Sequence, residues 1–272
     1  MNAPSSSRPL ILLFGMPRSG TTWLGKIFDS HPQTLYRHEP DSRGKLDALP
    51  QYAFARDITL YRDLLERFVA ELPAVRDEKV AASLPIFPKQ YYKPYQYYLR
   101  NFVVLAAKTV SRAWRSLPVP DVVDFAQHPQ VSLVWKSIES MARLGLVSKV
   151  FPSARCLLIL RHPCGYVNSV LRGEAANKFE GSAASSQDWN IYRMMLELPV
   201  ASRSGLDLQA VRGMVEVERL ALRWALSYEH AFTETTDAVN VARICYEDFC
   251  DDPVAQAKVA FEFCNLRFPV ET

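Results

Sequence analysis

The residues best suited to chemistry lie in one short turn, which runs from Gly15 to Thr22 with the sequence GMPRSGTT. Its two glycines have the G-x-x-x-x-G spacing of a loop whose backbone N–H groups close on phosphate oxygens. Nucleotide hydrolases carry a lysine directly after the second glycine, where this chain has Thr21. That lysine supports the charge on a transferred phosphoryl group, so its absence argues against a triphosphate. The turn therefore indicates a cradle for one terminal phosphate.

Side chains of the turn add phosphate-binding groups to its backbone. They are the guanidinium of Arg18 and the hydroxyls of Ser19, Thr21 and Thr22, beside the backbone of Gly20. A strand and a helix must hold them in place. Leu10 to Phe14 is a continuous apolar run, as expected of a strand covered on both faces. Apolar residues then recur at helical spacing from Trp23 to Phe28, until Pro32 ends the pattern. A bound anion would lie at the positive end of this helix.

Glu39 is the first candidate for moving a proton. It lies in an extended segment, Gln33 to Pro40, and the proline after it keeps it out of a helix. A crossover as short as the one that follows Arg18 returns the chain to the same sheet edge, which predicts Glu39 beside the turn. A carboxylate within hydrogen-bond reach of an alcohol gives general-base help of about 10²–10⁴-fold. His38 is the rival base and ranks second, because neighbours in an extended segment point to opposite faces.

Lys136 is a second charged residue at the end of a predicted strand. The run from Val131 to Lys136 reads as a strand with the lysine at its carboxyl end, followed by a helix from Ser137. Ligands of open parallel sheets bind outside the carboxyl ends of the strands. We therefore expect Lys136 near the site that the turn forms, where its ammonium group can stabilise developing negative charge.

The sequence PRSGTTWL after an apolar strand resembles the 5′-phosphosulfate loop of the sulfotransferases. These enzymes use 3′-phosphoadenosine 5′-phosphosulfate (PAPS) and release 3′,5′-ADP. The resemblance implies that Arg18 to Thr22 bind the 5′-phosphosulfate. It also implies an α/β, P-loop-like, three-layer fold with a central parallel sheet flanked by helices. It covers the chain from about Leu10 to Phe268.

A second motif makes the resemblance more specific. Arg155 to Leu160 reads as another buried strand, and it runs into RHPCGYVNS, from Arg161 to Ser169. In sulfotransferases such a strand ends in arginine, with a serine eight residues on, and the pair grips the 3′-phosphate. A planar guanidinium suits phosphate oxygens, and Ser169 comes round two helical turns later. The chain thus has two predicted phosphate sites, and the first of them lacks the lysine that nucleotide hydrolases carry after the second glycine. This combination suits a 3′,5′-bisphosphorylated nucleotide better than ATP. Tyr246 opens YEDF, which resembles a family segment whose tyrosine contacts the nucleotide, although the family's preceding arginine is displaced here to Arg243.

The resemblance also implies catalytic roles. In the carbohydrate and tyrosylprotein branches, a glutamate placed like Glu39 takes the proton of the acceptor hydroxyl. A lysine placed like Lys136 stabilises the transition state, and we expect Arg18 to share that role. These matches favour those branches over the cytosolic aryl type, although the cytosolic hydroxysteroid enzymes use histidine, which keeps His38 as the alternative. The expected acceptor is a hydroxyl on a glycan, a glycolipid or another hydroxylated small molecule, with a tyrosine-bearing peptide as the alternative. We expect transfer to need no metal.

The remaining patterns predict one domain. We expect residues 1–8 to be a disordered leader and residues 9–272 to form a single sulfotransferase domain. Further patterns predict a long helix from Asp207 to about Thr233, a strand from Val239 to Cys245 and a helix from Pro253 to Cys264. In the family the chain continues beyond this helix and supplies a loop over the cofactor. We expect that C-terminal tail to be absent here.

The stretch around residues 90–117 leaves two interpretations open. Its tyrosine-dense start leads into a predicted helix, Leu99 to Leu117, that carries four basic residues. Tyrosines with interleaved bases can line a sugar-binding groove or lie at a membrane surface. The alternative is a helix with a solvated basic face and tyrosines packed at its foot.

Composition bounds the class of protein. The chain has 272 residues, 49% of them hydrophobic, which suits one large α/β domain. A net charge of +3 is too small to imply nucleic-acid binding. Its five cysteines are widely spaced, with no C-x-x-C pair, so we expect reduced thiols and no structural metal. The longest uncharged apolar run is too short to span a membrane, and the N-terminus has no apolar core, so we expect a soluble cytoplasmic protein.

Two other functions compete with sulfuryl transfer. A P-loop kinase of a small molecule would need a magnesium-holding acidic strand end and a phosphate-bridging lysine, and neither is evident in the sequence. A nucleotide-binding protein without turnover would bind the cofactor and transfer nothing. The sequence leaves the acceptor and the oligomeric state open.

Overall fold

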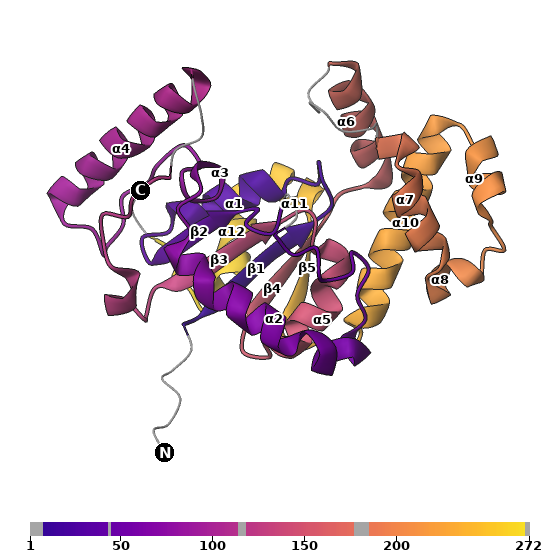
Figure 1. The fold of residues 1–272 in the computed structure, drawn as a ribbon, viewed down its shortest axis with the longest axis horizontal. Helices are drawn as coiled ribbons and strands as arrows, with labels where there is room; N and C mark the ends of the chain where they lie inside the picture. The colour runs from indigo at the N-terminus through magenta and orange to yellow at the C-terminus, as the bar shows by residue number, and fades with distance from the viewer. Residues whose placement is uncertain (1–7, 43–44, 114–117, 177–184, 270–272) are drawn as a thin grey trace.

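A parallel sheet of five strands lies at the centre of the protein (Figure 1). The structure, a computed structural model, describes residues 8–42, 45–113, 118–176 and 185–269. The strands stand in the order β2-β3-β1-β4-β5, and each neighbouring pair is parallel. They are β1 (Leu10–Gly15), β2 (Thr34–His38), β3 (Ser132–Ser137), β4 (Arg155–Leu160) and β5 (Val241–Cys245).

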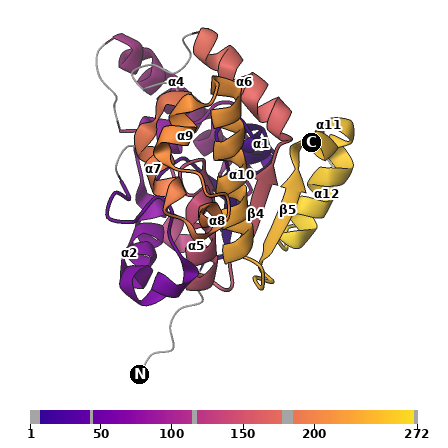
Figure 2. The same cartoon turned by 90° about the vertical axis from the view of Figure 1, so that its right-hand side faces the viewer.

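Helices connect these strands and cover both faces of the sheet. They are α1 (Thr21–Ser30), α2 (Ile58–Glu71), α3 (Glu78–Ala81), α4 (Pro94–Ala113), α5 (Leu144–Val150), α6 (Pro163–Ala175), α7 (Trp189–Leu196), α8 (Pro199–Ser202), α9 (Leu208–Gly213), α10 (Glu216–Glu234), α11 (Tyr246–Asp251) and α12 (Pro253–Phe263). Figure 2 shows α11 and α12 on one side of β4 and β5, and α5 and α10 on the other. The expected three-layer α/β fold is confirmed.

The alternation of side chains along β1 explains the two layers of core. Leu12 and Phe14 pack into the cluster under α2, α5 and α10, whereas Ile11 and Leu13 pack into the cluster under α1 and α12. All four are fully buried, because successive residues of a strand point to opposite faces and both faces here are covered. The continuous apolar run in the sequence has this origin.

Three predicted helices differ from the observed ones. The helix predicted from Leu99 begins earlier, since α4 starts at Pro94, and its expected end at Leu117 lies outside the described residues. No helix begins at Ser137, which is the last residue of β3. Its hydroxyl accepts hydrogen bonds from the backbone N–H groups of Glu139 (3.1 Å) and Ser140 (2.9 Å), which closes a turn before the chain becomes helical. The long helix predicted from Asp207 is broken into α9 and α10. The break follows a glycine, and the Glu218 side chain caps the second helix by accepting from the N–H of Val215 (3.0 Å).

The ends of the chain add two findings. Residues 1–7 of the expected leader lie outside the described residues, but Arg8 is anchored, since its guanidinium donates to the carbonyls of Val131 (3.0 Å) and Phe125 (2.5 Å). Among the described helices, none is both long and apolar enough to cross a membrane.

Candidate functional site

Each strand of the sheet carries one of the predicted site groups at its carboxyl end. Across the sheet, from β2 to β5, these groups are Glu39 after β2, Lys136 next to last in β3, the Arg18 to Thr22 turn after β1, Arg161 after β4 and Tyr246 after β5. Since all five strands run parallel, these ends meet at one edge, where ligands of open α/β sheets bind. The topology thus gathers side chains from distant parts of the chain, from Arg18 to Tyr246, into one row.

The two glycines of the turn are required by close contacts. A Cβ on Gly15 would lie 2.7 Å from the Ser19 hydroxyl and 2.9 Å from the Ile159 carbonyl oxygen. Gly20 has a φ of 92°, and a Cβ there would lie 2.3 Å from the ring of Tyr246. Any side chain at either position would therefore displace the turn or the neighbouring elements. The G-x-x-x-x-G spacing reflects this packing as well as the approach of a ligand.

Helix α1 begins directly after the turn without a side-chain cap. Its N-cap is Gly20, and no side chain accepts from its first turn, so its first backbone N–H groups remain available to an anion. The three hydroxyls of the turn differ in how far they are exposed at this end of the helix. Ser19 is fully buried, and its hydroxyl donates to the carbonyl of Met16 (2.6 Å), which closes the turn itself. Thr21 is buried and Thr22 is exposed.

Three elements converge on Arg18. Its Nε donates to the hydroxyl of Ser169 on α6 (3.0 Å), and its backbone carbonyl accepts from Nη1 of Arg161 (2.8 Å). The guanidinium of Arg161 also stacks over the ring of Tyr246, 4.6 Å from its centroid, and that ring covers Gly20. The predicted 5′-cradle and the predicted 3′-phosphate pair therefore lie side by side. Arg18 has a φ of 68°, a left-handed conformation that turns its side chain towards α6.

The residues present fit a phosphate at this place. Among the described side chains, the Nε atoms of Arg155 and Arg161 are both buried without a hydrogen-bond partner, and of these two only Arg161 lies at the carboxyl edge of the sheet. A buried unpaired guanidinium donor is costly, and a phosphate oxygen is the acceptor that its planar fork matches. The first turn of α6 lies against the same group, since a Cβ on Gly165 would lie only 3.1 Å from that Nε.

Glu39 and Lys136 form an ion pair at the other side of the turn. The Nζ of Lys136 donates to Oε1 of Glu39, and the backbone N–H of Glu39 donates to the Lys136 carbonyl (2.8 Å). The lysine side chain is only 1% exposed, and the glutamate side chain is 23% exposed, so the carboxylate is the member that solvent or an acceptor can reach. Burial lowers the pKa of Lys136, and the Glu39 charge opposes that shift.

The strand order corrects the prediction that Glu39 lies beside the turn. Strand β3 lies between β1 and β2, so Glu39 is adjacent to Lys136 and not directly beside the turn. The argument that His38 and Glu39 face opposite sides is also wrong. Glu39 has a φ of 47°, which is left-handed, and its Oε1 lies 3.8 Å from Nε2 of His38. Burial and the nearby Lys136 charge lower the pKa of His38 to about 4, and its Nδ1 bonds the Tyr36 hydroxyl (2.9 Å).

Asp41 is a site residue that sequence reasoning missed. Its carboxylate is buried, 2% exposed, and accepts from the indole N–H of Trp135 (3.1 Å) and the hydroxyls of Ser137 and Ser140 (2.5 Å each). Trp135 and Ser137 flank Lys136 in β3, so one carboxylate ties the segment after Glu39 to the strand that carries the lysine. No motif marks an aspartate for this contact, because its partners lie far away in the chain.

We expect the substitution Asp41→Asn to lower the free energy of unfolding by about 1.5–3 kcal/mol, because bonds to a charged acceptor are replaced by weaker ones at a buried position. Urea denaturation followed by circular dichroism measures this. Asp47→Asn changes an exposed carboxylate in the same segment and is the matched control, with an expected change near zero. Equal effects of the two substitutions would show that Asp41 does not hold the two strand ends together.

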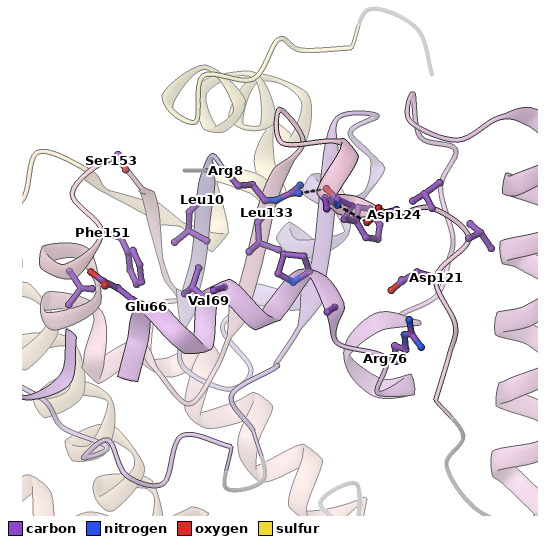
Figure 3. Close-up of a pocket in the computed structure, with 18 of the residues that line it drawn as sticks. Arg8, Leu10, Glu66, Val69, Arg76, Asp121, Asp124, Leu133, Phe151 and Ser153 are labelled. Carbon is purple, nitrogen blue, oxygen red and sulfur yellow. Dashed lines mark hydrogen bonds between the residues drawn. The ribbon is translucent and has the colours of Figure 1, made fainter. Parts of the chain in front are cut away.

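A cavity lies away from this row of residues. It has a volume of about 1130 Å³ and is lined by Leu10, the first residue of β1, and Leu133, the second residue of β3, together with α2 and the segment around Asp121. Figure 3 shows these side chains around the opening, with Arg76 and Asp121 to one side. Because parallel strands begin at this edge, the cavity is at the opposite end of the sheet from the turn.

Comparisons with known proteins agree with the motifs. A family model described as the sulfotransferase family matches residues 9–270. The sulfotransferase domain from the curacin biosynthetic pathway is similar over 97% of this chain and 77% of its own, with 16% identity and a TM-score of 0.47. The sulfotransferase domain of the Synechococcus PCC 7002 olefin synthase is similar over 98% of this chain and 78% of its own, with 16% identity and a TM-score of 0.44. A sulfotransferase from Alicyclobacillus acidocaldarius is similar over 96% of this chain and 82% of its own, with 14% identity and a TM-score of 0.43. No curated protein matches the chain.

Proposed function

Because the chain belongs to the sulfotransferase family, an enzyme family, we propose that it transfers a sulfuryl group from PAPS to the hydroxyl of a glycan, a glycolipid or another hydroxylated small molecule. The observation that carries this proposal is the row of strand ends. It places two arginines, a phosphate-binding turn and a carboxylate–lysine pair along one edge of the sheet.

The residues that would hold the cofactor fall into two groups. The backbone from Arg18 to Thr22 and the first N–H groups of α1 would bind the 5′-phosphosulfate. Arg161 and Ser169 would bind the 3′-phosphate, and Tyr246 would contact the nucleotide. Arg161 has an unpaired buried donor for this purpose, and Ser169 would share its hydroxyl between Arg18 and the phosphate. Ser19 stays in this set through its backbone only, since its hydroxyl is occupied.

The chemistry then divides among three side chains. When bound, PAPS supplies the sulfuryl group and leaves as 3′,5′-ADP, so that an O–S bond to the acceptor forms as the S–O bond to the 5′-phosphate breaks. Glu39 accepts the proton of the acceptor hydroxyl, which is a poor nucleophile until that proton is leaving. Lys136, together with Arg18, offers positive charge for the negative charge that develops on the leaving phosphate oxygen.

Two features favour the carbohydrate and tyrosylprotein type of site over one with a histidine base. Glu39 is partly exposed and pairs directly with a buried lysine. His38 has one ring nitrogen bonded to Tyr36, and its lowered pKa of about 4 makes it a weak base. We therefore assign the general base to Glu39. His38 is the alternative that substitution at each position separates.

Calorimetric titration with 3′,5′-ADP, run beside AMP and ATP with Mg²⁺, tests the cofactor directly. We expect tight binding of 3′,5′-ADP and weak binding of the other two, because two phosphate sites on one nucleotide are matched only by the bisphosphate. A preference for ATP with Mg²⁺ would overturn the assignment in favour of a kinase. Binding of 3′,5′-ADP without transfer of sulfuryl to any acceptor would indicate a nucleotide-binding protein.

The substitution Arg161→Ala is expected to weaken 3′,5′-ADP binding by about 10–100-fold, since each hydrogen bond between charged groups contributes about 1.5–3 kcal/mol. The affinity for AMP, which has no 3′-phosphate, should fall much less in this variant. Arg155→Ala is the matched control: it removes an arginine from the other end of the same strand, where the guanidinium stacks on Phe263. Equal losses for 3′,5′-ADP and AMP in Arg161→Ala would contradict the assignment of the 3′-phosphate.

A further inference from the structure

Helix α4 presents an apolar face to solvent. It lies beyond the β2 edge of the sheet, at one end of the molecule (Figure 1). Six large side chains on it are exposed: Tyr95 (62%), Tyr98 (72%), Leu99 (47%), Phe102 (71%), Leu105 (54%) and Val110 (41%). With 3.6 residues per turn, these positions fall on one side of the helix. We call them the α4 face.

Two basic residues of the helix, Arg100 and Lys108, point the other way. Arg100 is buried and donates to the carbonyls of Pro120 (2.9 Å) and Ala81 (2.6 Å), and Lys108 pairs with Glu78 (3.3 Å). Val104 and Ala107 are buried on the same side. Over positions 94–111 the helix is therefore apolar on its outer side, and its two basic residues there lie on the inner side. The side chains of Arg112 and Arg115, the other two basic residues of the predicted helix, lie outside the described residues.

The absence of charge indicates which kind of partner covers the α4 face. Among the described side chains of α4, at positions 94–111, every exposed residue is uncharged. Binding to an anionic membrane surface would draw on exposed lysines and arginines around the apolar residues, whereas Arg100 and Lys108, the two bases at positions 94–111, are engaged inward. An uncharged aromatic and aliphatic surface instead resembles the core of a protein interface, where charged residues are depleted and tyrosine and phenylalanine are enriched.

The order of residues along the face makes it complementary to itself. The middle of the segment from Tyr95 to Val110 lies next to Phe102. If two copies pack antiparallel about a two-fold axis at Phe102, Tyr95 of one copy lies opposite the turn that ends at Val110 of the other, and Tyr98 lies opposite Ala106. Large side chains then meet smaller ones, and no like charges are opposed, as an isologous interface requires. A parallel arrangement would instead place tyrosines against tyrosines.

We propose that the protein forms a symmetric dimer through antiparallel packing of two α4 faces. An aromatic side chain buries about 150–250 Å², so three that are more than half exposed, with the aliphatic ones, offer roughly 500 Å² per copy. The dimer then buries on the order of 1,000 Å² in total, the lower limit for specific interfaces. A patch of this size is also near the largest that monomers usually expose. The inference is independent of the proposed sulfuryl transfer.

Sedimentation velocity over a concentration series tests the proposal. The wild-type protein is expected to pass reversibly from monomer to dimer. Phe102→Glu places two carboxylates together at the axis, and is expected to raise the dimer dissociation constant by about 100-fold or more. Leu60→Glu, at a 73% exposed leucine on α2, is the matched control and should dimerise like the wild type. Circular dichroism of each variant checks that it is folded.

A charge rescue tests the antiparallel arrangement itself. Tyr98→Glu and Ala106→Lys should each weaken the dimer. The double variant should regain affinity, because the introduced carboxylate of each copy then meets the introduced ammonium group of the other, and this contact forms twice across the axis. A wild-type protein that stays monomeric at every concentration would overturn the proposal. So would a Phe102→Glu dimer as stable as the wild type, or monomeric protein that binds lipid vesicles through the α4 face.

Discussion

The substitution Glu39→Gln is expected to lower kcat for sulfuryl transfer by about 10²–10⁴-fold, the usual contribution of a general base. Glutamine keeps the size of the side chain and can still accept a hydrogen bond from Lys136, but it cannot take the acceptor's proton. Affinity for 3′,5′-ADP should stay unchanged, because the phosphate-binding groups follow β1 and β4 or lie on α6. Steady-state kinetics with PAPS and calorimetry with 3′,5′-ADP measure the two quantities separately.

Two control variants separate this effect from a loss of folding and from the neighbouring base. Glu78→Gln removes another largely buried carboxylate that pairs with a lysine, Lys108, away from the strand ends, and should leave kcat unchanged. His38→Gln keeps a hydrogen-bonding group beside Tyr36 and should reduce kcat far less than Glu39→Gln does. If His38→Gln had the larger effect, the proton would pass to the histidine and the assignment of the base would be wrong.

The substitution Lys136→Met is expected to lower kcat by about 10²–10³-fold, the usual effect of removing one group that stabilises developing charge. Methionine has a similar length and suits a buried site. Lys89→Met is the control, since Lys89 is also a buried lysine and pairs with Asp29. It donates to the hydroxyl of Thr34 at the amino end of β2, away from the carboxyl ends of the strands. The control substitution should cost stability but not kcat. Equal losses of kcat in both variants would indicate a structural role for Lys136.

The pH dependence of the rate should change with Lys136. Burial lowers the pKa of its ammonium group, so the wild-type rate should fall on the alkaline side at a pH below 10.5, as the proton leaves and the positive charge is lost. Lys136→Met has no such charge to lose and should lack this alkaline limb. An unchanged profile would show that the ion pair is not part of the reaction.

The α4 dimer and the transfer reaction can be tested apart from one another. Phe102 lies on the outer side of a helix beyond β2, and none of the contacts that hold Arg18, Arg161 or Glu39 involves it. A dimer would therefore be found even in a variant without turnover.

The sequence alone was enough to predict the turn from Gly15 to Thr22 and its flanking elements. The strand before it, the helix after it and the two glycines depend on local backbone conformation and on apolar spacing, and both are written in consecutive residues. The strand Arg155 to Leu160 was predicted to the residue for the same reason. The motif at Arg161 and Ser169 was recognisable because a strand end and a helix face fix its spacing.

Tertiary structure decided how those pieces meet. The insertion of β3 between β1 and β2 placed Glu39 against Lys136, and the left-handed backbone at Glu39 brought its carboxylate towards His38. The burial of Asp41 and the outward apolar face of α4 depend likewise on partners far away in the chain. Local spacing determines which face of a helix or strand is apolar, but strand order, and hence what each face meets, is determined by packing between distant segments.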